Sequence, residues 1–230
     1  SLLTIQSFKS APDTAETVME RQERKEHWEE VYQNKSTDEL TWYQRRPEIS
    51  LELIERAASE GDDGVKVRLI DVGAGASTLE DHLVDDKRFE LTALDIAGSA
   101  LERIRERLGP VKSAKIDWKT ADLTDDVSPL GPFDIWHDRA VFHFLTDPAD
   151  RAAYRGNLQR AVPSGGHAIL STFSLEGPEK CSGLPVRQYS AETLSEELGP
   201  DWRLLESHRE DHPTPWGGTQ NFVYGLFRRQ

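Results

Sequence analysis

The residues with the clearest chemical potential lie in the stretch LIDVGAGAST, residues 69–78. An apolar run ends in Asp71, Gly73 and Gly75 follow with one residue between them, and Ser77 stands where a helix would begin. The glycines let the backbone turn sharply and come close to a ligand, and the first N–H groups of a helix are free to bind it. The pattern predicts a nucleotide-binding loop, with an ordinary strand-to-helix turn as the alternative.

Two more acids stand at the ends of later apolar runs. Asp95 lies 20 residues beyond Gly75, where a carboxylate can accept hydrogen bonds from both hydroxyls of a ribose. Asp122 can accept the exocyclic amino proton of a purine while Leu123 covers the purine face. A glycine-rich loop and two acids at three successive strand ends together predict a bound adenosine compound.

The loop also narrows the kind of adenosine compound. A dinucleotide loop favours a third small residue where this chain has Thr78, and the loop lacks the Lys followed by Ser or Thr of a P-loop. Asp71 would repel a pyrophosphate but attract an amino group. The residues therefore favour an adenosine ligand with a cationic amino-acid end.

The elements that must position these residues alternate between two types. Short apolar or β-branched runs predict strands at residues 66–72, 89–96, 115–122, 133–138 and 167–173. Helical spacing of apolar residues predicts helices at 77–85, 99–108 and 150–162. Such alternation is typical of a parallel sheet with right-handed crossovers and helices on both faces.

The C-terminal part breaks this alternation. After a helix that begins at Ser190, residues 203–209 and 221–228 have strand character, and the link HPTPWGGTQ is too short to hold a crossover helix. The two runs predict an antiparallel hairpin. The expected fold class is α/β: a three-layer α/β/α sandwich with a Rossmann-like, seven-stranded, mostly parallel sheet and an antiparallel C-terminal hairpin.

The N-terminal part is expected to cover this core. Residues 16–35 and 47–60 predict two helices joined by the Trp-rich connector LTWYQRRPE, and the first dozen residues predict a loose arm. We expect residues 1–60 to form an N-terminal arm and helical lid packed on the core. Residues 61–230 are expected to form the ligand-binding domain, so that the 230 residues make one domain overall.

Composition excludes several classes of function. A formal net charge of −13 opposes binding to nucleic acid or to an anionic membrane, and no apolar run is long enough to span one. A single cysteine, Cys181, excludes an internal disulfide and a Cys-rich zinc site, and the histidines show no pair at metal-ligand spacing. We expect no metal, a cytoplasmic location because no export signal is visible, and a monomer or homodimer.

These motifs resemble the class I S-adenosylmethionine-dependent methyltransferases. The matching pieces are the glycine motif at residues 71–75, the ribose acid Asp95, the adenine motif at 121–123, and the strands FDIWHD and PSGGHAILSTF. The segments HWEEVYQNK, TWYQRRP, WHDRAVFHFLTD and GPEKCSGLPVRQY resemble a bacterial subgroup whose substrate is unassigned. The N-terminal pattern is also similar to protein-lysine methyltransferases that modify a translation elongation factor or citrate synthase.

The resemblance implies S-adenosylmethionine as cofactor and S-adenosylhomocysteine as product. Trp42 and Tyr43 of the connector predict a lid that closes over the cofactor, and their ring faces would attract its sulfonium cation. Core packing is the simplest role of Trp28 and Tyr32, which stand four residues apart on a helix, and it is the alternative for the connector. The expected cofactor-binding residues are Trp28, Tyr32, Trp42, Asp71, Gly73, Ala74, Gly75, Ser77, Asp95, Ile96, Ala121, Asp122, Leu123, Asp138 and Arg139.

The loop after the fourth strand faces the methyl group in this fold class, so the resemblance makes it the place for catalytic residues. Asp138 is expected to orient the cofactor or the acceptor, with a cap of the following turn as its alternative role. His143 is a candidate proton acceptor, with a packed structural histidine as the alternative, and His137 is expected to be structural. We hypothesise that loss of Asp138 reduces turnover most.

The methyl acceptor is expected to bind nearby. In the resembled family, segments that bind the acceptor often follow the fifth strand, here residues 174–189. The expected acceptor-binding residues are Phe142, Arg187, Tyr189, His212 and Trp216, and the last four have the anchoring of loops as their alternative role. Cys181 is not expected to act as a nucleophile, because methyl transfer needs none.

The expected function is methyl transfer to an N, O or S atom of a small molecule. A protein lysine is the alternative acceptor. An NAD-dependent oxidoreductase and a non-catalytic module that binds an adenosine ligand are alternatives of other classes; Thr78 and the terminal hairpin disfavour the oxidoreductase.

Overall fold

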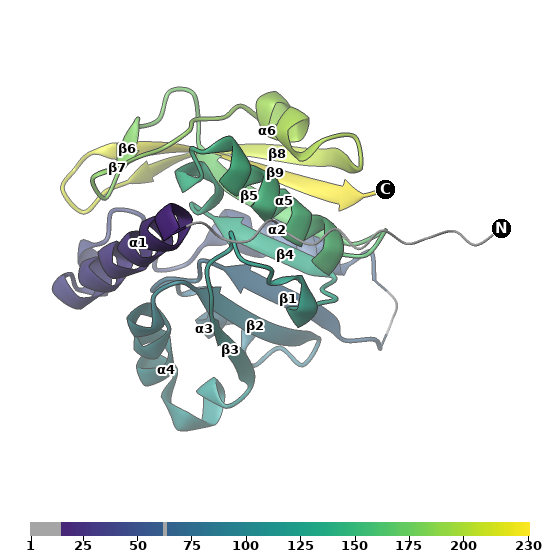
Figure 1. Ribbon diagram of the computed structural model, residues 1–230. Helices are drawn as coiled ribbons and strands as arrows, with labels where there is room; N and C mark the ends of the chain where they lie inside the picture. Colours follow the sequence, from purple (N-terminus) through teal and green to yellow (C-terminus); the bar gives the residue numbers. More distant parts are fainter. Residues whose placement is uncertain (1–14, 62–63) are drawn as a thin grey trace.

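A seven-stranded twisted sheet forms the centre of the computed structural model, which describes residues 15–61 and 64–230 (Figure 1). In the order β3-β2-β1-β4-β5-β9-β8, the strands are Ile116–Thr120, Phe89–Asp95, Val67–Val72, Ile135–Arg139, His167–Phe173, Thr219–Arg229 and Trp202–Pro213. The first five strands in this order run parallel, and β9 is antiparallel to both of its neighbours. The predicted fold class, including the terminal hairpin, is confirmed.

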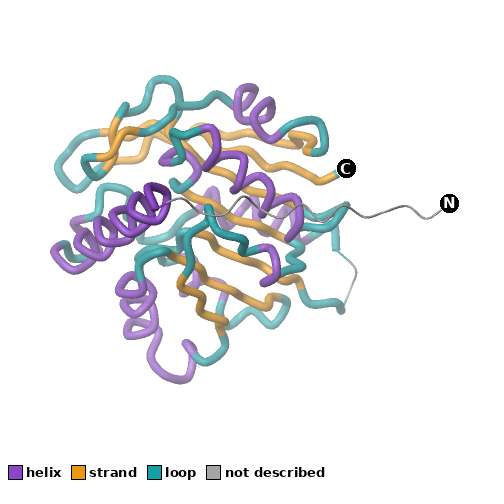
Figure 2. The backbone as a smooth tube through the Cα atoms, in the orientation of Figure 1, coloured by secondary structure: helices purple, strands orange, loops and turns teal. Residues whose placement is uncertain are grey.

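Helices flank the sheet on both faces (Figure 2). The helices α2 (Glu48–Ala58), α3 (Leu79–Leu83) and α4 (Gly98–Ser113) share one apolar core with the sheet. The helices α5 (Pro148–Ala161) and α6 (Ala191–Leu198) share the other. Because side chains alternate along a strand, Leu69 of β1 lies in the first core while Ile70 and Val72 lie in the second.

Local sequence explains where two helices on the α5 side begin. Asp147 caps α5 by accepting a hydrogen bond from the Ala149 N–H, and Pro148 occupies the first helical position, where its missing N–H costs nothing. Ser190 caps α6 as predicted, because its hydroxyl accepts from the Thr193 N–H.

Several predicted boundaries differ from the structure. The helix predicted at 77–85 is the shorter α3, and β3 ends at Thr120, so Asp122 lies in the following turn. The helix predicted at 99–108 continues to Ser113 through Gly109, whose φ of 72° interrupts the helical backbone. A further small hairpin, β6 (Lys180–Cys181) with β7 (Leu184–Pro185), follows β5.

The N-terminal helix α1 (Ala15–Asn34) packs against α4. The carboxylate of Glu29 accepts hydrogen bonds from the N–H groups of Gly98 and Ser99, the first residues of α4. A short 3-10 helix, η1 (Thr37–Glu39), then leads into the connector that ends at α2. The loose arm expected in the first dozen residues lies outside the described residues, and the domain division stays a prediction. In the described part of the chain, no helix is long and apolar enough to cross a membrane.

Candidate ligand-binding site

One pocket brings together most of the predicted cofactor residues. It lies at the carboxyl ends of β1, β2 and β4, under α1 and the connector before α2. We call it the main pocket. Its predicted lining residues are Trp28, Tyr32, Trp42, Asp71, Gly73, Ala74, Ser77, Asp95, Ile96, Ala121, Asp122, Leu123 and Arg139.

The glycine loop has the backbone that its sequence predicts. Gly73 and Gly75 have φ values of 64° and 57°, a conformation that other residues rarely adopt. A side chain at Gly73 would collide with Val141, and one at Gly75 would collide with the Tyr32 hydroxyl. Both glycines are therefore required by conformation and by space, and Tyr32 closes directly over the loop.

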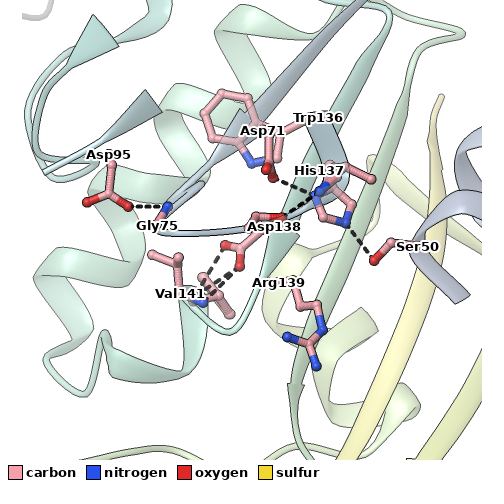
Figure 3. Close-up of polar contacts among 12 residues, drawn as sticks. Ser50, Asp71, Gly75, Asp95, Trp136, His137, Asp138, Arg139 and Val141 are labelled. Carbon is pink, nitrogen blue, oxygen red and sulfur yellow. Dashed lines mark hydrogen bonds and ion pairs between the residues drawn. The ribbon is translucent and has the colours of Figure 1, made fainter. Parts of the chain in front are cut away.

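Asp95 and Asp122 present carboxylates to the main pocket. Asp95 accepts a hydrogen bond from the Gly75 N–H at 2.8 Å (Figure 3). It accepts another from the Ala97 N–H, also at 2.8 Å. These bonds fix its orientation, and burial raises its pKa to about 6. Asp122 uses Oδ1 to hold Thr124, while its buried Oδ2 has no hydrogen-bond partner. An oxygen left this way is an acceptor that a ligand amino group can use.

Asp71 lies at the end of β1 against two other titratable groups. His137 Nδ1 lies 2.6 Å from Asp71 Oδ1, and His137 Nε2 lies 2.9 Å from Ser50 Oγ (Figure 3). The carboxyl of Glu80 also neighbours that of Asp71. Burial raises the pKa of Asp71 to about 7 and that of Glu80 well above its usual range, and it lowers the pKa of His137 to about 4.

Aromatic residues of α1 and the connector form the roof of the main pocket. The Trp28 ring lies 6.1 Å from Tyr32, 6.0 Å from Trp42 and 5.0 Å from Phe144, measured between ring centroids. The Arg139 guanidinium donates to the Trp42 carbonyl at 2.8 Å, which ties the roof to the end of β4. The roof covers the sheet edge below it.

The C-terminal hairpin also holds the connector. His212 Nε2 lies 2.9 Å from the Thr41 carbonyl oxygen, and the Gln44 amide donates to Glu210 at 2.5 Å. The Thr78 hydroxyl donates to the Gln44 carbonyl from the pocket side. The connector is thus fastened from two directions.

The two predicted catalytic residues do not line the main pocket. Asp138 is fully buried and accepts hydrogen bonds from the N–H groups of Val141 and Phe142 and from the Tyr154 hydroxyl, the last at 2.6 Å. This geometry is the turn cap that the sequence left as the alternative role. His143 is also fully buried, and its Nδ1 accepts from the Phe173 N–H at 3.2 Å. Their catalytic roles stay predictions. In the structure, Asp138 caps the turn after β4, and His143 accepts a hydrogen bond from the backbone of β5.

The predicted acceptor-binding residues are dispersed, and none lines the main pocket. Phe142 and Tyr189 belong to the core between the sheet and α5. Arg187 lies over the Tyr189 ring at 5.3 Å, and Trp216 is 74% exposed in the turn between β8 and β9. Only His212 touches the connector. Acceptor contacts by these five residues stay predictions.

The main pocket also contains residues that the sequence did not single out. These are chiefly Arg24, Ser50 and Phe144. His137, which was expected to be structural only, and Cys181, which was not expected to act as a nucleophile, also line it. Ser50 had a readable signal, because it shares the buried face of α2 with Leu53, Ile54 and Ala57. A polar residue on an otherwise apolar helix face needs a buried partner.

Comparisons with known proteins agree with this geometry. A family model described as a methyltransferase domain matches residues 70–168. The nodulation protein S of Rhizobium tropici is 29% identical over 103 residues, 45% of this chain and 42% of that protein. The malonyl-[acyl-carrier protein] O-methyltransferase of Anoxybacillus flavithermus is 31% identical over 106 residues, 46% of this chain and 38% of that protein. The alignments thus span less than half of either relative.

Solved structures share the fold over nearly the whole chain. The N-methyltransferase NodS from Bradyrhizobium japonicum, in complex with S-adenosylhomocysteine, superposes with a TM-score of 0.64 at 17% identity, over 88% of this chain and 98% of that chain. The 1,6-didemethyltoxoflavin-N1-methyltransferase of Burkholderia thailandensis, with 1,6-didemethyltoxoflavin and S-adenosylhomocysteine bound, gives 0.63 at 16% identity, over 100% and 98%. At these identities the likeness is one of fold.

Proposed function

We propose that the chain is a class I S-adenosylmethionine-dependent methyltransferase and that it transfers a methyl group to an N, O or S atom of a small molecule. The observation that carries the proposal is the meeting of Asp71, Asp95 and Asp122 with the glycine loop in one pocket. The named activities of the relatives and fold neighbours support it.

The residues of the main pocket suit S-adenosylmethionine. Asp95 would hold the ribose hydroxyls, because each oxygen keeps a lone pair beyond its backbone bond. Asp122 Oδ2, which has no hydrogen bond and lies 3.7 Å from Arg24 Nε, would accept from the adenine amino group, with Leu123 against the ring. Asp71 would pair with the cationic amino-acid end, because a buried carboxylate is stabilised by a positive charge beside it, and its direct polar neighbours are His137 and the carboxyl of Glu80.

The bound cofactor supplies an already activated methyl group. The chain has to align the acceptor with it and keep water out, and proximity and orientation can contribute about 7–11 kcal/mol to such a step. Trp28, Tyr32 and Trp42 form the roof that excludes water, and their ring faces attract a sulfonium cation. A base is needed only when the acceptor arrives protonated.

The cofactor assignment is tested by thermal shift with the full chain. S-Adenosylmethionine and S-adenosylhomocysteine should each raise Tm, because a ligand at a concentration of 100 times its Kd adds about 2.7 kcal/mol to the free energy of unfolding. NAD should leave Tm unchanged. A shift with NAD alone would contradict the assignment and favour an oxidoreductase. Loss of both shifts on removal of residues before Pro47 would further support the lid role of that segment.

The acceptor class is tested by incorporation of labelled methyl groups into a cell lysate. Label in the small-molecule fraction supports the proposal, whereas label in protein identifies the protein-lysine alternative. Absence of label, despite cofactor binding, would favour a non-catalytic binding module. A cytoplasmic location and a monomeric or homodimeric state stay predictions.

A further inference from the structure

A chain of hydrogen bonds between Ser50, His137 and Asp71 runs along one wall of the main pocket. The proposed binding of the cofactor uses Asp71 but gives no role to Ser50 or His137. Ser50 Oγ lies 2.9 Å from His137 Nε2, and His137 Nδ1 lies 2.6 Å from Asp71 Oδ1. The exposed fractions of the three residues are 0%, 2% and 4%, and all three line the main pocket. Figure 3 shows the three side chains in line, from α2 through β4 to β1.

The register of the sheet creates this chain. Asp71 of β1 and His137 of β4 are direct partners in the parallel pair, so their side chains leave the sheet on the same face. That face is the one covered by α2, and Ser50 lies in the first turn of α2 on its buried side. The three polar groups therefore meet at the edge of the apolar core that α2, α3 and α4 share with the sheet.

Further charges surround the chain on several elements. Glu80 of α3 is 3% exposed, neither of its carboxyl oxygens has a donor partner, and its neighbour is the carboxyl of Asp71. Two carboxyls in contact form a hydrogen bond only when one of them holds a proton. Asp138 and Arg139 of β4 also act on His137. The carboxyls of Glu80 and Asp71 can therefore share one proton, and the group of Asp71, Glu80 and His137 can accept a second one.

We propose that Ser50, His137 and Asp71 form a proton-transfer chain that receives the proton lost by the methyl acceptor. This inference rests on the proposed function. Ser50, at the pocket end, contacts the acceptor, and His137 and Asp71 carry the proton away from it. The site is thereby suited to acceptors whose N–H, O–H or S–H group still holds its proton on arrival.

The step balances in atoms and charge. A bond forms between the acceptor atom and the methyl carbon, the bond from that carbon to sulfur breaks, and its electron pair stays on sulfur. The acceptor proton moves to Ser50 Oγ, the Ser50 proton to His137 Nε2, and the His137 Nδ1 proton to Asp71 Oδ1. The positive charge of the sulfonium and the negative charge of Asp71 disappear together, so the net charge of the site does not change. The ammonium at the amino-acid end then keeps the cofactor's own carboxylate as its counter-charge.

The proton ends on Asp71 and not on His137. Burial raises the pKa of Asp71 to about 7 and lowers that of His137 to about 4, so the carboxylate holds a proton better than the imidazole does. This order differs from that of serine hydrolases, in which the aspartate stays ionised and the histidine carries the charge. Burial is the main cause of this order, and the hydrogen bond from the carboxyl of Glu80 lowers the pKa of Asp71 only in part.

A purely structural role for the same bonds would be to dock α2 on β4. Nitrogen-15 NMR of the imidazole in the full chain at pH 6 separates the two roles. With sinefungin, whose amine supplies a positive charge, Asp71 should be ionised and His137 protonated on Nδ1. With S-adenosylhomocysteine, which is neutral at sulfur, His137 should be protonated on Nε2. The same tautomer in both complexes would overturn the proposal.

The kinetic test uses labelled S-adenosylmethionine and the small-molecule fraction of a cell lysate. Ser50→Ala and His137→Gln should slow label transfer by about 100-fold, with Kd for S-adenosylhomocysteine changed by less than about twofold. Ser50→Thr, which keeps the hydroxyl, should recover part of the rate. Ser59→Ala, exposed at the end of the same helix, and His208→Gln, on β8, are the matched controls and should retain it.

The outcomes separate this inference from the proposed function. Full rates in Ser50→Ala and His137→Gln would overturn the proton-transfer chain and leave methyl transfer intact. If the wild-type protein transfers no label to the small-molecule fraction, the proposed function is contradicted. The measurement of the His137 tautomer still decides whether the protons of Ser50, His137 and Asp71 shift with the charge of the ligand.

Discussion

The carboxyl ends of β1 and β4 lie side by side, and each carries an aspartate whose surroundings give it a different task. Asp138 pairs in register with Val72, one residue beyond Asp71, yet it faces α5 and accepts three hydrogen bonds from the protein. Asp71 faces α2 and the main pocket, where its neighbours are His137 and the carboxyl of Glu80. One carboxylate is satisfied by the fold, and the other is left for a ligand.

The difference follows from which face of the sheet each side chain enters. Residues one apart on a strand point to opposite faces, so His137 and Asp138 serve different layers although they are neighbours in the sequence. Burial raises the pKa of Asp138 to about 6, but three donors stabilise its ionised form. An aspartate at a strand end is therefore a site residue only when the layer above it leaves it a free acceptor.

The largest expected effect is on the stability of the β4 end. Asp138→Ala would leave two backbone N–H groups and the Tyr154 hydroxyl unpaired in the core, which should lower the free energy of unfolding by about 3 kcal/mol. Asp71→Ala should cost less, since it also removes a destabilised charge. Urea denaturation measures both. A larger loss in Asp71→Ala would reverse the assignment of the two aspartates.

The second largest effect is on the affinity for S-adenosylmethionine, and we expect it from substitution of Asp71 in β1 and not of Asp138 in β4. Asp71→Asn should weaken binding of S-adenosylmethionine by about 30-fold, about 2 kcal/mol, because a hydrogen bond to a charged group is lost. Asp138→Asn should leave Kd within about twofold, since it does not line the main pocket. Isothermal titration calorimetry gives both values. Equal losses in the two variants would break the comparison.

The pH dependence of stability offers a smaller effect on the same region. Burial raises the pKa of Glu80 in the folded state above its value in the unfolded chain. The protein therefore has the full stability that comes from protonated Glu80 when the pH is below the unfolded pKa. It loses this stability as the pH rises through the folded pKa. Glu80→Gln stays neutral and should match wild-type Tm near pH 5 but exceed it by about 2–4 °C at pH 8. Differential scanning calorimetry at the two pH values measures this, and a gap that narrows with rising pH would contradict it.

The smallest effect should come from the contacts that hold the connector over the β1 end. Glu210 accepts hydrogen bonds from the Gln44 amide and the Tyr224 hydroxyl, the latter at 2.7 Å. Glu210→Gln weakens both bonds without emptying the space and should raise the Kd of S-adenosylhomocysteine about threefold. Arg203→Gln, an exposed change on the same strand, is the control. Identical Kd values in the two variants would remove the hairpin from cofactor binding.

The sequence predicted one half of this molecule better than the other, for a physical reason. The positions of the glycine loop, Asp95 and Asp122 depend on local turns at strand ends, and a few consecutive residues determine each of these turns. The roles of His137 and Asp138 depend on strand register and on which helix covers which face. Neither is visible in a single sequence, so Asp138, which was predicted to be catalytic, lies on the α5 side of β4 instead.

Ser50 shows how part of that gap could be closed. Its place on the apolar face of α2 marks it as a residue with a buried partner, but the partner, His137, lies 87 positions away and is brought near only by the packing of α2 on β4. The connector behaves similarly, because its fastening to β8 and β9 is a tertiary contact between the two ends of the described chain. Long-range contacts of this kind carry no local signature.

A crystal structure of the full chain with S-adenosylhomocysteine tests the central claim most directly. The ribose hydroxyls should lie on Asp95, the adenine amino group on Asp122 Oδ2, and the amino-acid end beside Asp71, under Trp28 and Trp42. A nucleoside bound elsewhere, or one that leaves Asp95 and Asp122 without contact to it, would contradict the assignment of this pocket.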